Sequence, residues 1–155
     1  MPAVRPITPS FAVAGELTAA DIADLARLGF RGLISNRPDG EERGQLTAAE
    51  TADLAAAAGL AFRHVPASKH DLFSAGTVAA MQAAVADLEG PVLAHCKSGL
   101  RSAVLWAIVA AGEQPIGEVV ATVRAAGFDI SGLADDIVDA GSATLAAAGT
   151  TGRAV

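Results

Sequence analysis

Short apolar segments alternate with helical segments along most of this chain, and this alternation constrains the fold more than any other feature. The predicted strands are Phe11–Ala14, Phe30–Ser35, Ala61–Val65 and Val92–His95. Strands separated by helices of about 10–15 residues indicate crossover connections, which join parallel strands. We therefore expect an α/β fold with a mainly parallel central sheet of about four to five strands, flanked by helices.

Helix boundaries are marked by capping sequences and glycines. Thr18-Ala19-Ala20-Asp21 and Thr47-Ala48-Ala49-Glu50 each resemble a capping box, and Gly29 and Gly59 suit the left-handed residue that ends a helix. Further helices are predicted from Ser74 or Thr77 to Leu88 and over Ser102–Ala111, Pro115–Ala126 and Gly132–Ala148. Trp106 is expected in the core. The polar loops after Ser35 and Val65 should open on the same side as the loop after His95, because ligands bind beyond the carboxyl ends of such strands.

Length and composition favour one domain over residues 1–155, with residues 149–155 as a frayed tail. Apolar residues make up 52% of the chain. The longest strongly apolar run, Ala103–Ala111, is about half the ~20 residues that a membrane span needs. Two prolines interrupt the first six residues, so a secretory signal is not expected. We expect no membrane association and a cytoplasmic location.

The charge balance argues against nucleic acid as a partner. Eleven Lys and Arg face seventeen Asp and Glu, which gives a net charge of −6. Such a chain repels a phosphate backbone, and no basic run offsets this repulsion. An apolar face on the last two helices is compatible with a homodimer.

The chain has a single cysteine, Cys96. It can form no internal disulfide, no cysteine-rich metal site and no redox pair with a second thiol. If Cys96 reacts, an external thiol or another acceptor must regenerate it. His64 and His70 are too isolated to predict a metal site, so we expect neither a metal nor a cofactor.

The segment from His95 to Ser102 carries the chemistry. It joins an apolar strand to an apolar helix, and its backbone N–H groups can wrap a small anion at the helix N-terminus. The predicted anion-binding residues are Lys97, Ser98, Gly99 and Leu100. Arg101 can close this loop with its planar two-pronged donor.

A cysteine in such a loop should ionise easily and act as a nucleophile. Ser102 is expected to hydrogen-bond to the Cys96 sulfur. The alternative for Cys96 is a small buried hydrophobe, which the placement of Gly99 and Arg101 disfavours. His95 either orients the loop or serves packing alone.

Three segments together resemble the family called the beta-lactamase hydrolase-like protein, phosphatase-like domain, which is also described as a sulfur transferase family. They are Ser35–Glu42, Val92–Ser102 and Ala126–Asp129, and the resemblance extends from about Ile7 to Leu133. It implies the fold of dual-specificity tyrosine phosphatases. It leaves the reaction open, because family members are associated with phosphatase and with sulfur-transfer activity.

Two local features favour sulfur transfer. Four residues separate Cys96 from Arg101, as in rhodanese-type sulfurtransferases, whereas typical tyrosine phosphatases have a longer loop. The related phosphatases also place an acid in the loop after the strand that corresponds to Ala61–Val65. That place falls near Ser68 or Lys69, and the nearest carboxylate is Asp71. Asp71 is either that acid or a solvated, helix-capping residue.

The leading hypothesis is therefore a rhodanese-like sulfurtransferase. Cys96 would accept a sulfane sulfur from a small donor, such as thiosulfate or glutathione persulfide, and pass it to a thiol or to cyanide. The alternative is a cysteine-dependent phosphatase that acts on a phosphate ester through a Cys96 phosphocysteine, with Asp71 as general acid. A non-catalytic module that binds an oxyanion or a persulfide is the third hypothesis.

The polar loop Asn36–Arg43 supplies a supporting residue. Arg37 is predicted either to support the cysteine loop or to contact the donor. Asp39, Glu41 or Glu42 would then fix its orientation. The alternative is an ordinary solvated turn around Pro38-Asp39-Gly40.

Overall fold

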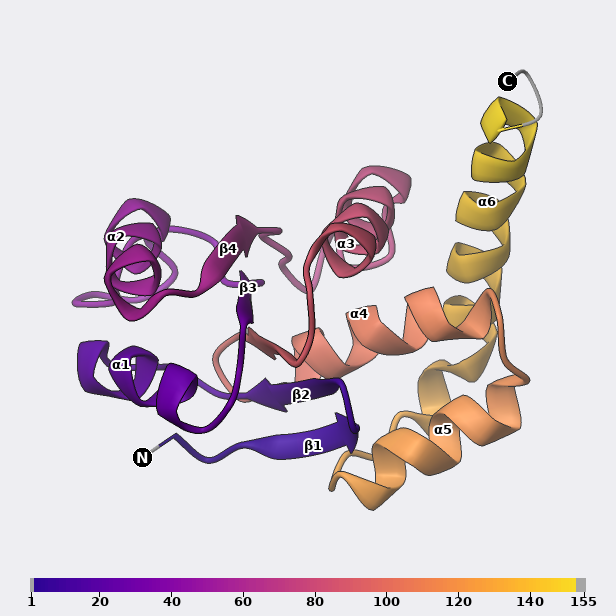
Figure 1. Cartoon of the computed structure of the whole chain (residues 1–155). Coiled ribbons are helices and arrows are strands. Elements are labelled where there is room, and N and C mark those ends of the chain that lie inside the picture. Colours follow the sequence, from indigo (N-terminus) through magenta and orange to yellow (C-terminus); the bar gives the residue numbers. More distant parts are fainter. Residues whose placement is uncertain (1, 153–155) are drawn as a thin grey trace.

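The central sheet has five strands in the order β1-β2-β5-β3-β4 (Figure 1). The computed structural model describes residues 2–152, with side chains described as far as Ala143. The strands are β1 (Arg5–Thr8), β2 (Phe11–Ala14), β3 (Gly32–Ser35), β4 (Ala61–His64) and β5 (Val92–His95). β1 pairs antiparallel with β2, and all the other pairs are parallel. The predicted α/β class and mainly parallel sheet are confirmed.

Helices cover both faces of the sheet (Figure 1). They are α1 (Ala19–Arg27), α2 (Ala48–Ala58), α3 (Ala75–Asp87), α4 (Leu100–Ala111), α5 (Ile116–Ala125) and α6 (Ala134–Gly152), with a short 3-10 helix over Ser131–Leu133. α1 and α2 lie on one face, and the remaining helices lie on the other.

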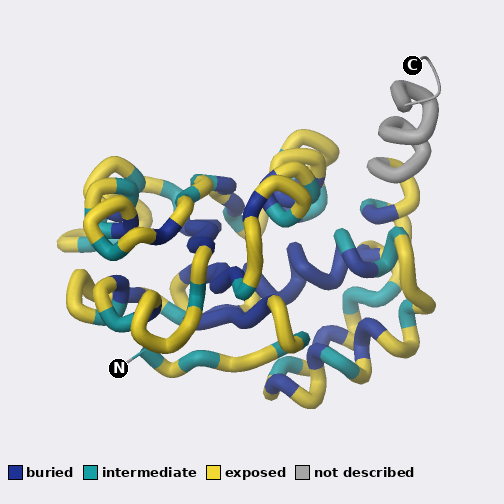
Figure 2. The backbone as a smooth tube through the Cα atoms, in the orientation of Figure 1, coloured by how far each residue is buried: buried dark blue, intermediate teal, exposed yellow. Residues whose placement is uncertain are grey.

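Successive residues of the strands pack into two separate hydrophobic cores, one on each face of the sheet. On β3, Leu33 packs with α1 and α2, whereas its neighbour Ile34 packs with α3 and α4. This follows from the period of two in a strand, which sends successive side chains to opposite faces. α4 is the most buried of the helices, and eight of its twelve residues are buried (Figure 2). Trp106 is buried on this helix, as predicted.

The capping interpretation is confirmed for two helices. The side chains of Thr18 and Thr47 each accept a hydrogen bond from the backbone N–H three residues later, and both capping boxes are complete. Gly59 ends α2 in the left-handed conformation with φ of 80°. The starts of α1 and α2 and the end of α2 therefore follow from local sequence.

Three boundaries differ from the expectation. β1 was not predicted, because its four residues include Pro6, which cannot donate to a sheet ladder and is tolerated here in an edge strand. α4 begins at Leu100 rather than Ser102, so Arg101 lies in its first turn. α6 continues past Ala148 to Gly152, so only residues 153–155 of the predicted tail lie outside the described residues.

As far as Ala143, most of the apolar side chains of the last two helices pack inside the chain. Val119, Val123 and Ile137 are fully buried, and Val138 is 37% exposed. The homodimer therefore stays a prediction. Over the described residues, no helix is both long and apolar enough to span a membrane.

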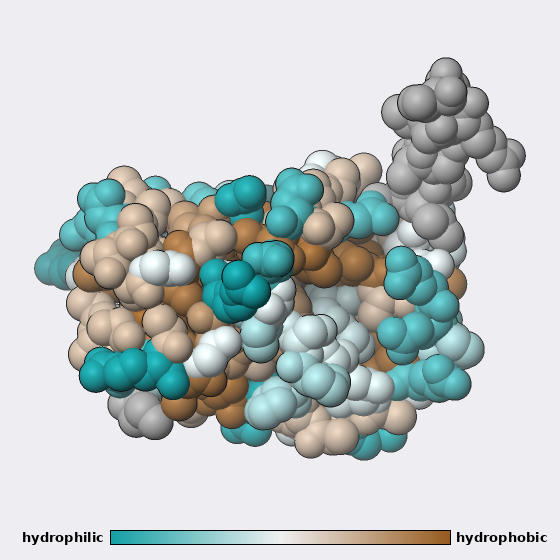
Figure 3. Space-filling view, in the orientation of Figure 1, coloured by the Kyte–Doolittle hydropathy of each residue, from teal (hydrophilic) through white to brown (hydrophobic). Residues whose placement is uncertain are grey.

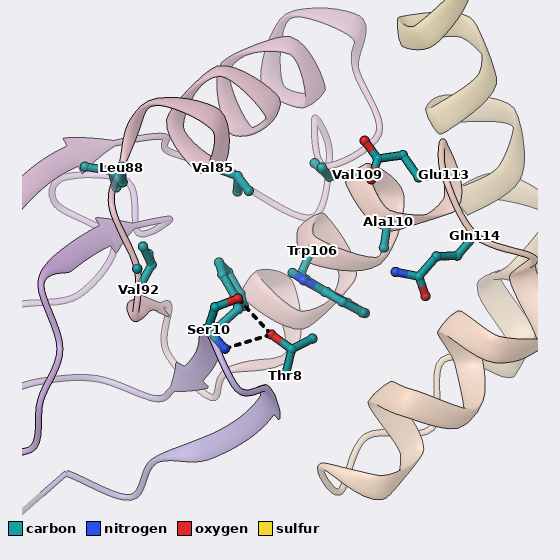
Figure 4. A pocket seen from close by; sticks show the side chains of 12 residues that line it. Thr8, Ser10, Val85, Leu88, Val92, Trp106, Val109, Ala110, Glu113 and Gln114 are labelled. Atoms are coloured by element: carbon teal, nitrogen blue, oxygen red, sulfur yellow. Dashed lines mark hydrogen bonds between the residues drawn. The ribbon is translucent and has the colours of Figure 1, made fainter.

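A cavity of about 250 Å³ lies beside α3 and α4. Figure 3 shows apolar surface below α3, and Figure 4 shows Trp106 and Val109 from α4 facing Val85 from α3. Val92, at the start of β5, also lines this cavity. Because Cys96 follows the other end of β5, the cavity is separate from the cysteine loop.

Candidate active site

Three loops meet at the carboxyl ends of β3, β4 and β5, as the parallel sheet predicts. Arg101, after β5, donates to Glu41 from the loop after β3 and to the carbonyl oxygen of Ala67 from the loop after β4. The Asn36 backbone N–H also donates to the His95 carbonyl oxygen at 2.8 Å. These contacts gather residues far apart in the sequence around Cys96.

The cysteine loop donates a backbone hydrogen bond to the sulfur of Cys96. The Gly99 N–H donates to the Cys96 Sγ at 3.1 Å, from the N-terminal end of α4. Gly99 has φ of 96°, a conformation that other residues rarely adopt. A backbone donor at a helix N-terminus stabilises a negative charge on the sulfur.

Cys96 itself is fully buried. A substrate therefore reaches the sulfur only after surrounding side chains move. The hydrogen bond to Glu41 is the largest cause that raises the pKa of the Arg101 guanidinium, and an interaction with Cys96 acts in the same direction. The guanidinium is therefore close enough to Cys96 to interact with it.

Glu41 holds the guanidinium of Arg101. Its two carboxylate oxygens accept from Arg101 Nη1 at 2.7 Å and from Nη2 at 2.8 Å. One of them also accepts from Arg37 Nε at 3.1 Å. The hydrogen bonds from Arg101, followed by those from Arg37, lower the pKa of the Glu41 carboxyl.

Arg37 supports the cysteine loop indirectly. Its guanidinium is buried and pairs with Glu42 at 3.0 Å and with Glu16 at 3.5 Å, in addition to Glu41. Lys97 of the cysteine loop pairs with Glu42 as well. Glu41 and Glu42 thus fix the orientation of Arg37, whereas Asp39 instead accepts from the backbone N–H of Ala48 at the start of α2.

Ser102 does not donate to the sulfur, and this expectation is corrected. Its hydroxyl donates to Asn36 Oδ1 at 2.8 Å, and both residues are buried. The Asn36 amide donates in turn to the carbonyl oxygen of Val65 at 2.9 Å. Ser102 therefore ties α4 to the loops after β3 and β4, because its only proton is committed to Asn36.

His95 is buried with both ring nitrogens lacking a hydrogen-bond partner among the described residues. Burial lowers the pKa of His95 to about 4, and the nearby charges of Arg37 and His64 act in the same direction. The ring is therefore neutral at pH 7. His95 touches the site through its backbone carbonyl, which favours a role in orienting the loop.

The remaining predicted residues lie at the rim. Asp71 is exposed, and its carboxylate accepts from the backbone N–H of Ser68 at 2.7 Å. The Ser98 hydroxyl accepts from the Leu100 N–H at 3.4 Å. Asp71 lies in the loop whose Ala67 carbonyl oxygen contacts Arg101, but in the described part of the chain no side-chain hydrogen bond or ion pair joins Asp71 to Arg101.

Sequence reasoning missed two parts of the site. It did not predict the Glu41 contact with Arg101 or the role of Asn36. Both residues lie in the polar loop singled out by the sequence, but contacts across 60 and 66 residues leave no local signal. Among the described residues, no group of three or more His, Cys, Asp and Glu side chains gathers to hold a metal ion.

The fold and the cysteine loop are those of a phosphatase-like α/β protein, in which a cysteine directly follows a central parallel strand. The chain belongs to the family described as beta-lactamase hydrolase-like protein, phosphatase-like domain, whose model matches residues 3–113. The family resemblance predicted from the sequence is thereby confirmed.

Known proteins similar to this chain agree with that assignment. The Beta-lactamase hydrolase-like protein of Xylella fastidiosa is 40% identical over 126 residues, which cover 80% of this chain and 29% of that protein. The relative from Agrobacterium fabrum is 39% identical over 108 residues. The chain thus matches under a third of the length of these curated relatives.

Solved structures share the fold. A candidate phosphatase from Neisseria meningitidis is 29% identical with a TM-score of 0.77, and the match covers 89% of this chain and 98% of that one. TpbA from P. aeruginosa, in complex with pTyr, is 17% identical with a TM-score of 0.55, over 92% of this chain and 82% of that one. These neighbours are phosphatases or phosphatase candidates, and they do not support the leading sulfurtransferase hypothesis.

Proposed function

We propose that this chain is a cysteine-dependent phosphatase that hydrolyses phosphate monoesters through a Cys96 phosphocysteine. The observation that carries the proposal is the hydrogen bond from the Gly99 N–H to the Cys96 Sγ, with the Arg101 guanidinium beside the same sulfur. The family and the fold of its neighbours support this reaction. The proposal ranks phosphatase chemistry above sulfur transfer, which is the reverse of the expectation from the sequence.

The chemistry follows from these groups. The Cys96 thiolate attacks phosphorus, an S–P bond forms and the bond from phosphorus to the ester oxygen breaks. Backbone N–H groups of the loop and the Arg101 guanidinium stabilise the charge on the phosphoryl oxygens. Water then attacks the phosphocysteine, which releases phosphate and restores the thiolate.

An acid is required when the leaving group is an alkoxide. Asp71 is the carboxylate that we assign to this role, because its loop contacts Arg101 through Ala67. It must leave its hydrogen bond with the Ser68 N–H to reach a bound ester. An Asp71→Ala variant should lose more activity on alkyl phosphates than on aryl phosphates, whose leaving groups need little protonation.

The direct test uses p-nitrophenyl phosphate. The wild-type protein should release p-nitrophenol above the buffer rate, and Cys96→Ser should reduce release to background. Mass spectrometry after rapid acid quench should find a phosphoryl group on Cys96. Release that persists in Cys96→Ser would contradict the proposal, as would a wild-type rate equal to that of buffer.

Sulfur transfer is the second candidate function, and one observation favours it. Four residues separate Cys96 from Arg101, and the resulting tight loop suits a single persulfide sulfur. Incubation with glutathione persulfide, followed by mass spectrometry, should then add one sulfur atom to Cys96. Cyanide should remove it as thiocyanate. A thiol that gains a phosphoryl group and no sulfur would exclude this candidate.

A further inference from the structure

We infer that three glutamates around the cysteine loop select substrates that carry one anionic group and a neutral or basic remainder. We call Glu16, Glu41 and Glu42 the acidic collar. The inference rests on the proposed function and adds to it the class of substrate. It follows from the way in which the cations of the site are already paired.

Each basic side chain at the cysteine loop has a carboxylate partner from the collar. Arg101 is held by both oxygens of Glu41, at 2.7 and 2.8 Å. Lys97 pairs with Glu42. The guanidinium of Arg37 contacts all three glutamates, at 3.1, 3.0 and 3.5 Å.

These formal charges cancel. The three cations contribute +3 and the three carboxylates −3, so the side chains of the site sum to zero. The remaining positive potential comes from the N-terminus of α4 and from the Gly99 N–H, which donates to the Cys96 sulfur. That potential is local and suits one small anionic group.

The collar is positioned to meet the rest of a substrate. The side chains of Glu16 and Glu42 are 63% and 38% exposed, so they lie at the rim rather than at the sulfur. The Glu16 backbone N–H donates to the Lys97 carbonyl oxygen at 3.0 Å, which fixes this rim to the cysteine loop. A second anionic group on a substrate would therefore approach carboxylates.

Three exposed cations could oppose this effect. Lys97, whose side chain is 53% exposed, is paired with Glu42. The side chains of Arg43 and Lys69, in the flanking loops, form no hydrogen bond or ion pair within the described part of the chain, so neither is held toward the site. The net charge of −6 adds to the repulsion of a polyanion. The carboxylates of the collar should therefore determine the preference for substrates that lack a second anionic group.

The size of the effect is set by Coulomb's law in a solvated rim. One carboxylate at about 7 Å from a substrate charge, in water, changes an encounter or binding constant roughly two- to threefold. Added salt weakens this effect, because exposed charges are screened beyond about 8 Å at physiological ionic strength.

The experiment compares three phosphotyrosine tripeptides that differ only in their flanking residues: Lys, Ala or Asp on both sides. The leaving group is identical in all three, so differences in kcat/KM report the flanking charge. The wild-type protein should prefer the Lys-flanked peptide to the Asp-flanked one roughly fivefold or more at low salt. This ratio should fall toward one at high salt.

Substitutions in the collar test whether its glutamates cause the preference for the Lys-flanked peptide. Glu16→Gln and Glu42→Gln should each reduce the Lys-to-Asp ratio roughly two- to threefold. The matched control is Glu89→Gln, which removes an exposed carboxylate paired with Arg31 at 3.0 Å near the start of β5, away from the cysteine loop. The control should leave the ratio unchanged.

A second readout does not depend on turnover. Cys96 is alkylated with neutral iodoacetamide and, separately, with anionic iodoacetate, and the ratio of the two rates reports the potential at the entrance. Glu16→Gln and Glu42→Gln should raise the iodoacetate rate relative to the iodoacetamide rate, and Glu89→Gln should not.

The outcomes separate the inference from the proposed function. A folded protein that hydrolyses neither p-nitrophenyl phosphate nor any of the peptides contradicts the phosphatase proposal. Whenever none of the peptides is hydrolysed, the ratio of the two alkylation rates tests the collar by itself. Hydrolysis with equal kcat/KM for all three peptides contradicts the inference that the collar selects substrates by charge. A preference for the Asp-flanked peptide also contradicts it. Unchanged alkylation ratios in both collar variants overturn it as well.

Discussion

At the scale of single residues, the charged side chains of the site are fixed in position by ion pairs and hydrogen bonds. Arg101 contacts Glu41 through both terminal nitrogens and Ala67 through one of them. A bidentate pair of this kind fixes both the distance and the plane of the guanidinium. The resting arrangement therefore keeps Arg101 beside a sulfur that is fully buried.

Glu41→Gln should loosen this arrangement. A neutral amide cannot accept at both positions from Arg101, so the guanidinium should lose its fixed position over the sulfur. We expect kcat for p-nitrophenyl phosphate to fall by about tenfold, which corresponds to about 1.4 kcal/mol, and iodoacetamide to alkylate Cys96 faster. Glu89→Gln is the control, and equal behaviour of the two variants would show that Glu41 does not position Arg101.

His95 should make stability depend on pH. Its pKa is about 4 in the folded protein and 6.5 when unperturbed, so between these values the unfolded chain binds a proton that the folded chain does not. The free energy of unfolding should therefore be highest above pH 6.5 and fall by up to about 3 kcal/mol as the pH drops to 4.

Urea unfolding at a series of pH values measures this effect. His95→Leu removes the titrating group and should flatten the curve between pH 4 and 6.5. His70→Gln, which replaces an exposed histidine, should follow the wild-type curve. A curve of wild-type steepness in His95→Leu would assign the pH dependence to other groups.

At the scale of elements, the junction between β5 and α4 shapes the site. The strand ends at His95, and the helix begins at Leu100, so one tight turn carries the nucleophile and the backbone donors. Gly99 forms the last residue of this turn, and a Cβ placed there would lie 3.0 Å from Phe128. The turn therefore requires glycine both for its φ and for space.

Gly99→Ala should reduce stability by about 1–2 kcal/mol, because a side chain at positive φ is strained. It should also reduce phosphatase activity, since Gly99 supplies the N–H that contacts the sulfur. The control is Gly40→Ala, where φ is 73° and no atom lies within 4 Å of the added Cβ. Its stability should also fall, while its activity should persist. Full activity in Gly99→Ala would contradict this role of the turn.

At the scale of the whole molecule, helices beyond the matched family region complete the core. The family model ends at residue 113, just after α4, and α5 and α6 then pack against α4. Gly141 of α6 lies so close to α4 that an added Cβ would meet the Ile108 carbonyl oxygen at 2.8 Å. This close approach fixes α6 on the helix that carries Arg101.

Gly141→Ala should separate these helices. Overpacking against a backbone atom should cost about 1–3 kcal/mol, despite the higher helix propensity of alanine. Gly76→Ala in α3, where the added Cβ meets no atom within 4 Å, should instead be neutral or stabilising by up to about 1 kcal/mol. Urea unfolding measures both, and a stabilised Gly141→Ala variant would show that the helices can relax.

Local sequence determined much of the fold. The period of the apolar residues, the capping boxes at Thr18 and Thr47 and the glycines at helix ends predicted the six α-helices and four of the five strands of the described chain, but not the short 3-10 helix over Ser131–Leu133. These signals act over a few residues and survive in the folded protein. β1 was missed because Pro6 weakens its strand pattern and pairing with β2 supplies its stability.

The sequence by itself also placed Cys96, Gly99 and Arg101 in one turn, because they are neighbours along the chain. Only the tertiary structure decided their partners. Parallel pairing of β3, β4 and β5 brings Asn36, Glu41 and Ala67 to the same edge of the sheet, where the Ser102 hydroxyl is drawn to Asn36 and the Arg101 guanidinium to Glu41. Such contacts depend on which strands are adjacent, and strand order is set by packing of the whole chain rather than by any local segment.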